Sequence, residues 1–198
     1  NLSNSDDSQL MEKAIASEDA TVDIHHAGTA MRFLTAYFAT RVNKTTTLTG
    51  SERMKERPIK ILVDALNSLG ASIKYTKKEG YPPLLIHGKT LSKSVVHLKA
   101  NISSQFISAL LLVAPTLKDG LTLHLEGEIT STPYINMTLS LLNELGVQST
   151  FESNTITVQP FVGNVTKTFT VESDWSSASY FYSIVALSPV GTQINISA

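Results

Sequence analysis

The chain has 198 residues, of which 42% are hydrophobic and 17% charged, a composition typical of a globular protein with an apolar core. The 16 lysines and arginines against 17 aspartates and glutamates give a net charge of −1, which argues against a nucleic-acid-binding surface and a polybasic membrane patch. The lack of cysteine excludes disulfides, cysteine-ligated zinc and a cysteine nucleophile. No apolar run reaches the roughly 18 residues of a membrane span, and no secretion signal is visible, so we expect a cytoplasmic protein.

Taken in order, the sequence first predicts an N-terminal helix. The segment SNSDD at residues 3–7 supplies an N-cap and acidic side chains, and an apolar stripe follows up to Ile15. The pattern beyond it predicts strands over 21–24 and 45–49, helices over 31–40 and from Pro58 to Gly70, and strands over 71–75, 84–87 and 95–98.

The same order of elements then recurs. Helices over 106–117 and 135–146 flank a strand over 121–125. Five positions of the first half have counterparts 76 residues later: Ile59, Val63, Leu66, Leu69 and Gly70 correspond to Ile135, Leu139, Leu142, Leu145 and Gly146. A third round is predicted from Asp174, with a helix over 176–187 and a strand over 192–196.

This repeat is longer than the roughly 20–50 residues of a solenoid repeat, and its order of elements predicts βαβαββ modules. The segments FISALLLVAP and YFYSIVAL are apolar on nearly all sides, so these helices belong in a core. We therefore predict an α+β protein of repeated βαβαββ modules, with buried helices and the sheets on the outside. The polar helix starts at Gly28, Ser103 and Ser176 would then face one surface together.

The stretch HHAGTAMRFLTAYF at residues 25–38 is where we first expect a ligand, because a turn leads directly into an apolar helix. Gly28 allows close approach to the backbone, and Thr29 can cap or hydrogen-bond. Arg32 stands where unpaired N–H groups and the positive end of the helix dipole favour an anion. An ordinary helix N-terminus has the same pattern, so the stretch needs support from the rest of the chain.

Two further segments carry residue types suited to anions or hydroxyl groups. RMKERP at 53–58 holds three cations before a helix and fits a solvated loop and an anion clamp equally well. SSQ at 103–105 suits phosphate or sugar hydroxyls, although plain N-capping is the simpler interpretation. Ser131 and Tyr134 lie at the corresponding position of the next helix start and could also bind a ligand. The alternative there is a capped helix with a half-buried tyrosine.

The titratable residues give weaker indications. His26 borders the Gly28 turn, but the five histidines lack a metal-ligand spacing: His25, His26, His87, His97 and His124. No carboxylate pair stands out as general acid and base. Asp23 and Asp174 each precede a polar helix start and are the acids of most interest.

Six segments together carry a more specific signal. They are AGTAMR at 27–32, RMKERPI at 53–59, LVDALNSLGA at 62–71, SSQF at 103–106, PYI at 133–135 and DWSSASYF at 174–181. In this order they resemble the family of 5-enolpyruvylshikimate-3-phosphate (EPSP) synthases, or 3-phosphoshikimate 1-carboxyvinyltransferases. The resemblance covers nearly the whole chain.

The resemblance implies two lobes of three βαβαββ modules each, which close over the active site. The family transfers the enolpyruvyl group of phosphoenolpyruvate to the 5-hydroxyl of shikimate 3-phosphate and releases phosphate. It implies no metal and no cofactor, a monomer, and small-molecule substrates without nucleic acid or membrane. A closed, dry site would stabilise the charges of a tetrahedral intermediate.

The resemblance also assigns residues. Shikimate 3-phosphate would be held by Ser103, Ser104, Gln105, Ser131 and Tyr134. Phosphoenolpyruvate would be bound by Gly28, Arg32, Arg57 and Gln105, with His26, Thr29 and Arg53 as further candidates. The family usually has Asn at the place of His26 and Pro at that of Phe33, so the aim of Arg32 and the response to glyphosate-like inhibitors are open.

The family enzyme is about twice as long as this chain. We expect residues 1–172 to form most of the shikimate 3-phosphate-binding lobe, and 173–198 a hinge with the first helix and strand of the other lobe. On this reading the chain is a fragment, and the family's catalytic acidic and lysine residues fall outside it. Binding without turnover is the expectation.

Three alternatives remain. The related enolpyruvyl transferases that act on a UDP-amino sugar share the module fold but commonly use a loop cysteine, which is absent here. A non-catalytic repeat scaffold would give Arg32, Arg57 and Gln105 no special role. A nucleic-acid role, as in phosphate-cyclase relatives of the fold, is disfavoured by the net charge and the lack of a basic stripe with aromatic residues.

Overall fold

The structure, a computed structural model, describes residues 3–171 and 175–196. These fall into two compact units, Asn1–Gly163 and Asn164–Ala198, which are described separately. The first unit holds a leading helix, α1 (Asp6–Ala16), and then two modules with the same order of elements.

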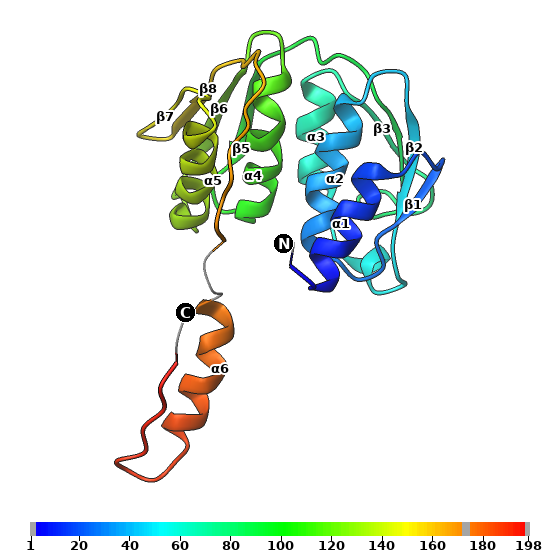
Figure 1. Cartoon of the computed structure of the whole chain (residues 1–198). Helices are drawn as coiled ribbons and strands as arrows, with labels where there is room; N and C mark the ends of the chain where they lie inside the picture. Colours follow the sequence, from blue (N-terminus) through cyan, green and yellow to red (C-terminus); the bar gives the residue numbers. More distant parts are fainter. Residues whose placement is uncertain (1–2, 172–174, 197–198) are drawn as a thin grey trace. The chain divides into compact units, whose positions relative to one another are not determined.

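Each module reads strand, helix, strand, helix, strand, strand (Figure 1). Module 1 consists of β1 (Thr21–Asp23), α2 (Gly28–Thr40), β2 (Thr45–Thr49), α3 (Lys60–Ser68), β3 (Ser72–Tyr75) and β4 (Leu84–His87). Module 2 consists of β5 (Val95–Lys99), α4 (Ser104–Val113), β6 (Leu121–Glu126), α5 (Thr132–Glu144), β7 (Ser149–Glu152) and β8 (Thr155–Val158). Short 3₁₀ turns lie at Met54–Glu56 and Ala114–Thr116. The predicted βαβαββ repeat is therefore confirmed.

The strand topology places the helix starts at one end of each module. The sheets have the orders β1-β2-β4-β3 and β5-β6-β8-β7, and in both the first two strands are parallel. In module 2, β8 runs antiparallel to both β6 and β7, so β5, β6 and β7 share one direction. Because α4 and α5 connect strands of the same direction, both run back along the sheet and begin near the carboxyl ends of these strands.

The core of the first unit lies between its two sheets, where α2, α3 and α4 run side by side (Figure 1). Strand β5 alternates, with Val96 and Leu98 buried and His97 exposed, as expected for a sheet with one solvated face. Helix α4 buries seven of its ten residues. Buried helices with sheets outside, the predicted architecture, therefore describe this unit.

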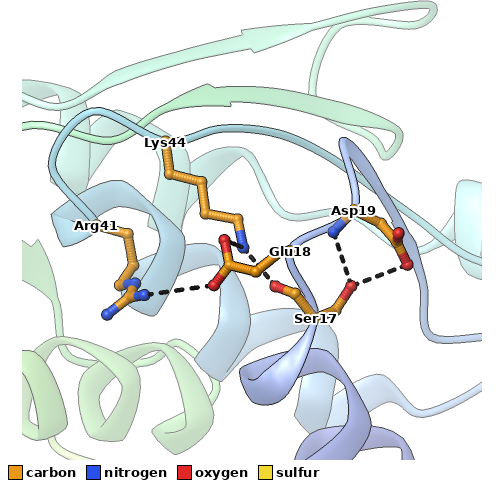
Figure 2. A network of polar contacts seen from close by, with 5 residues as sticks. All are labelled: Ser17, Glu18, Asp19, Arg41 and Lys44. Carbon is orange, nitrogen blue, oxygen red and sulfur yellow. Dashed lines mark hydrogen bonds and ion pairs between the residues drawn. The ribbon is translucent and has the colours of Figure 1, made fainter.

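A polar network ties the end of α1 to the region between α2 and β2 (Figure 2). The ammonium group of Lys44 donates to the backbone carbonyl of Ser17 and to the Glu18 carboxylate (3.1 Å). Arg41 lies 4.0 Å from the same carboxylate, and the Ser17 hydroxyl accepts from the backbone N–H of Asp19 (3.1 Å). These contacts hold α1 against α2, although exposed ion pairs of this kind contribute little stability individually.

Helix boundaries differ from the predicted ones for identifiable reasons. Helix α2 begins at Gly28, three residues before the predicted start, because the Gly-Thr-Ala segment is already helical. Helix α4 ends at Val113 and passes into the 3₁₀ turn, since Pro115 lacks the N–H that an α-helix needs there. Pro58 precedes α3, which begins at Lys60.

The second unit contains α6 (Trp175–Ala186), close to the predicted helix over 176–187. The predicted strand over 192–196 is wrong, because these residues form no strand. A strand needs a neighbour to pair its N–H and C=O groups, and none of the described strands takes that place. Asp174 and the predicted boundary at 172 lie outside the described residues. None of the helices in 3–171 and 175–196 has both the length and the apolar character needed to cross a bilayer.

The Ser108–Thr138 pair between α4 and α5 generates a stability prediction. The two hydroxyl oxygens are 2.8 Å apart, both side chains are buried, and the Thr138 hydroxyl donates to the Tyr134 carbonyl. We expect Ser108→Ala to lower the free energy of unfolding by about 1 kcal/mol, because Thr138 loses a buried partner. Urea denaturation measures this, with exposed Ser140→Ala on α5 as the control; equal effects of the two substitutions would contradict the prediction.

Candidate functional site

The starts of α2 and α4 lie side by side. The side-chain amide Nε2 of Gln105 donates to the Thr29 hydroxyl oxygen at 3.2 Å, and α2 packs along α4. Thr29 and Gln105 are each the second residue of their helix and are 76 positions apart, so they are counterparts in the two modules. Two positive helix ends and their unpaired backbone N–H groups are thereby directed at one region.

Arg32 is the buried cation of this region. It is only 8% exposed, and its Nη1 donates to the Gly28 carbonyl at 2.6 Å. Its Nε is buried without a hydrogen-bond partner in the described part of the chain, and its guanidinium lies 5.9 Å from the centre of the Phe106 ring. Burial, and secondly the charge of Arg57, lowers the pKa of Arg32 to about 10. An anion placed here would accept a hydrogen bond from the unpaired Nε–H and would offset the repulsion between Arg32 and Arg57.

Gly28 lies directly beneath two guanidinium groups. A Cβ atom at this position would stand 2.7 Å from Nη1 of Arg32 and 2.8 Å from Cζ of Arg57. A side chain at position 28 would therefore displace both guanidinium groups from their places over the first turn of α2. The predicted close approach of a ligand to this residue stays a prediction.

An open pocket of about 400 Å³ adjoins Arg57. Its walls are His26, Ser51, Arg53, Met54 and Arg57. Within residues 3–171 and 175–196, no carboxylate lies within ion-pair distance of Arg32, Arg53 or Arg57. These three guanidinium groups therefore have no acidic side chain as a direct partner among the described residues, which favours an anionic ligand.

His26 connects this pocket to α1. Its Nε2 lies 3.4 Å from a carboxylate oxygen of Asp6, and both side chains are largely exposed. The neighbouring His25 has a left-handed backbone (φ 48°) and donates its N–H to the Asp23 carboxylate at 2.8 Å. Asp23 thus stabilises the turn before α2.

The start of α4 presents the predicted polar cradle. Ser103 is the N-cap residue, and its hydroxyl accepts from the Gln105 backbone N–H at 3.4 Å, so the capping interpretation is correct for this residue. The Ser104 hydroxyl has no hydrogen-bond partner within the described residues and is half-buried. Ser104 and the carboxamide of Gln105 remain available for hydroxyl or phosphate groups.

Ser131 and Tyr134 lie at the start of α5, the next helix. Ser131 precedes the helix in the left-handed region (φ 60°) without a side-chain capping bond, and Tyr134 is 55% exposed instead of half-buried. Their helix packs against α4, but no side-chain hydrogen bond or ion pair joins either residue to Arg32, Arg57 or Gln105 within the described part of the chain. The third predicted helix start, at Ser176, belongs to the second unit.

Two residues of this region were missed from the sequence. Phe106 covers the Arg32 guanidinium, and Ser51 lines the pocket beside Arg57. Phe106 lies in the SSQF segment but was given no role there, and Ser51 lies in none of the six segments. The 76-residue correspondence could have indicated that Thr29 meets Gln105. The remaining histidines contact one another, threonines or, for His97, the Glu126 carboxylate, and no group of three metal-binding side chains occurs among the described residues.

Comparison with known proteins gives curated relatives of high similarity. A 3-phosphoshikimate 1-carboxyvinyltransferase of Bacteroides fragilis (strain YCH46) is 53% identical over 190 residues, covering 96% of this chain and 46% of the relative. The enzyme of that name from Tolumonas auensis is 44% identical over 176 residues, covering 87% of this chain and 40% of the relative. The chain thus spans about half the length of the curated relatives it matches.

The solved EPSP synthase of Acinetobacter baumannii superposes on 83% of this chain and 36% of its own, with a TM-score of 0.70 and 24% identity, a likeness of fold. The family model for EPSP synthase (3-phosphoshikimate 1-carboxyvinyltransferase) matches residues 3–197. This match and the relatives above establish that the chain belongs to the EPSP synthase family.

Proposed function

We propose that this chain supplies the shikimate 3-phosphate-binding part of an EPSP synthase. In that reaction the enolpyruvyl group of phosphoenolpyruvate moves to the 5-hydroxyl of shikimate 3-phosphate, and phosphate leaves. The observation that carries the proposal is the meeting of the α2 and α4 starts around Arg32, a buried cation with an unpartnered Nε among the described residues. The substrates are anions, as such a site requires.

On the α4 side, shikimate 3-phosphate would meet hydroxyl and amide groups. The Ser104 hydroxyl has no partner among the residues that the structure describes, and Gln105 offers one carbonyl oxygen and a second amide N–H, which suit the ring hydroxyls. Ser103 would contribute through the backbone of the helix start, because its hydroxyl already caps Gln105. Ser131 and Tyr134 would reach the ligand from the start of α5.

On the α2 side, phosphoenolpyruvate would meet the two guanidinium groups above Gly28. Arg32 is held by the Gly28 carbonyl and is already desolvated, so its interaction with a carboxylate or phosphate is strong. Arg57 is exposed and can turn toward the ligand. Thr29, Arg53 and His26 stand at the edge of this group, with His26 in the place where the family usually has Asn.

The same proposal covers the wider organisation. Residues 1–172 would belong to one lobe and 173–198 would lead into another, with a monomer acting in the cytoplasm without metal or cofactor. The scaffold alternative is less favoured, because a scaffold gives no reason for a buried arginine whose Nε lacks a partner among the described residues.

Calorimetric titration of the 198-residue chain with shikimate 3-phosphate tests the α4 side. We expect saturable binding that weakens by about tenfold or more in a Ser104→Ala, Gln105→Ala double variant, because two hydrogen bonds to a charged ligand are lost. A Ser140→Ala, Gln159→Ala variant makes the same chemical changes at exposed positions and should bind normally. Equal affinity of both double variants would exclude the assignment of Ser104 and Gln105.

The Arg32→Met substitution tests two claims: that Arg32 binds an anion at the start of α2, and that its buried charge costs stability in the ligand-free chain. The variant should no longer be stabilised by inorganic phosphate, whereas the ligand-free chain should keep its stability or gain about 1 kcal/mol, because a desolvated cation is removed. Above pH 10, Arg32 loses its proton in the folded chain but keeps it in the unfolded chain. The free energy of unfolding of the wild type should therefore rise relative to that of the variant, and the gap between the two free energies should become smaller.

Thermal or urea unfolding of both proteins from pH 7 to 11 measures this difference. Arg41→Met, a substitution of an exposed arginine distant from Gly28 along α2, is the control for general alkaline effects. A variant that is strongly destabilised at pH 7, or that still responds to phosphate as the wild type does, would contradict the role given to Arg32.

Turnover should be separable from binding. Because the chain corresponds to 46% of the Bacteroides enzyme, we expect it to bind shikimate 3-phosphate but to release no phosphate from a mixture with phosphoenolpyruvate. A malachite-green phosphate assay, with a full-length relative as the positive control, measures this. Phosphate release by the 198-residue chain alone would refute the expectation.

A further inference from the structure

The hydrogen bond between Gln105 and Thr29 joins a side chain with a proposed ligand role to one in the other module. Gln105 Nε2 donates to the Thr29 hydroxyl oxygen at 3.2 Å, and both side chains are only half-buried. A half-buried glutamine would otherwise sample several rotamers, and fixing it on binding would cost conformational entropy. The contact therefore restricts Gln105 before any ligand arrives.

The direction of the bond decides which atoms stay free. A glutamine carboxamide has two N–H donors and one carbonyl acceptor. With one N–H directed at Thr29, the carbonyl oxygen and the second N–H remain for a ligand, and the plane of the amide is set by the hydroxyl. Thr29 itself is held in the first turn of α2, which the rest of the helix and the buried Ala30 and Met31 keep in place.

We propose that Thr29 is a positioning residue for Gln105. The Thr29 hydroxyl, in module 1, orients the side-chain amide of Gln105, in module 2, and this amide binds shikimate 3-phosphate. The inference rests on the proposed function for its ligand, but the orientation of the amide belongs to the ligand-free chain. Thr29 then acts on shikimate 3-phosphate only through Gln105, whereas the sequence named Thr29 as a further candidate for phosphoenolpyruvate.

A double-mutant cycle tests the proposal. Thr29→Val keeps the shape of the side chain and removes the hydroxyl, and we expect the dissociation constant for shikimate 3-phosphate to rise about 3- to 10-fold. Thr29→Ser keeps the hydroxyl and should bind within about twofold of wild type. In the Gln105→Ala background, Thr29→Val should have no further effect, because the group that it positions is absent.

A ligand-free measurement accompanies the cycle. In ¹⁵N-resolved NMR spectra the Nε2 protons of Gln105 should have shifts distinct from those of the exposed Gln159 in wild type and Thr29→Ser, and should move to exposed-glutamine values in Thr29→Val. Backbone amide shifts elsewhere in α2 should change little, which separates loss of the bond from loss of the helix. Unchanged Gln105 side-chain signals in Thr29→Val would overturn the proposal.

The outcomes distinguish this inference from the proposed function. If Gln105→Ala does not weaken shikimate 3-phosphate binding, the assigned ligand role fails, and the NMR comparison alone decides whether Thr29 orients the amide. If Gln105→Ala weakens binding and Thr29→Val does not, the ligand role stands and the positioning role is overturned. A loss from Thr29→Val that persists in full in the Gln105→Ala background also overturns it.

Discussion

The packing of α2 against α4 is the contact on which the candidate site depends. It brings together the second residues of the two helices, Thr29 and Gln105, and with them two sets of unpaired backbone N–H groups. Neither helix start alone distinguishes itself from an ordinary N-terminus. Their juxtaposition, fixed by the apolar core behind them, creates a region of positive potential to which both helix starts contribute.

The two modules use equivalent positions for different purposes. Arg32 in α2 and Ser108 in α4 are counterparts 76 residues apart, yet Arg32 is an incompletely paired cation and Ser108 forms a satisfied bond to Thr138 in the core. The unpartnered Nε of a buried cation is expected to cost stability in the ligand-free fold, whereas the serine is expected to contribute to it. On the proposed function, module 1 keeps a buried cation for a ligand where module 2 has a hydrogen bond within the core.

Much of the fold could be predicted from the sequence because the repeat is long and its apolar periodicity is regular. Strands β2 and β4 have the predicted bounds, and α5 begins within a few residues of the expected start. The start of α2 was misplaced because Gly28 weakens the helical pattern where the helix in fact begins. The strand over 192–196 was inferred from a third round of the repeat, whereas a strand depends on a partner for its hydrogen bonds.

For the site, residue types were predictable and contacts were not. Glycine, arginine and polar residues at helix starts indicated an anion site, and the structure brings Gly28, Arg32 and Arg57 together. The covering of Arg32 by Phe106 depends on how two helices pack, which no local pattern encodes. The same holds for Ser131, which has a left-handed backbone before α5 and whose side chain makes no capping bond to that helix.

The most direct test of the central claim is an NMR titration of the 198-residue chain with inorganic phosphate and then with shikimate 3-phosphate, following backbone amides. The account predicts that the largest shifts occur together in residues 28–32 and 103–107, the first turns of α2 and α4. Shifts confined to one of these turns, or centred on the opposite ends of the two helices around Arg41 and Val113, would contradict it.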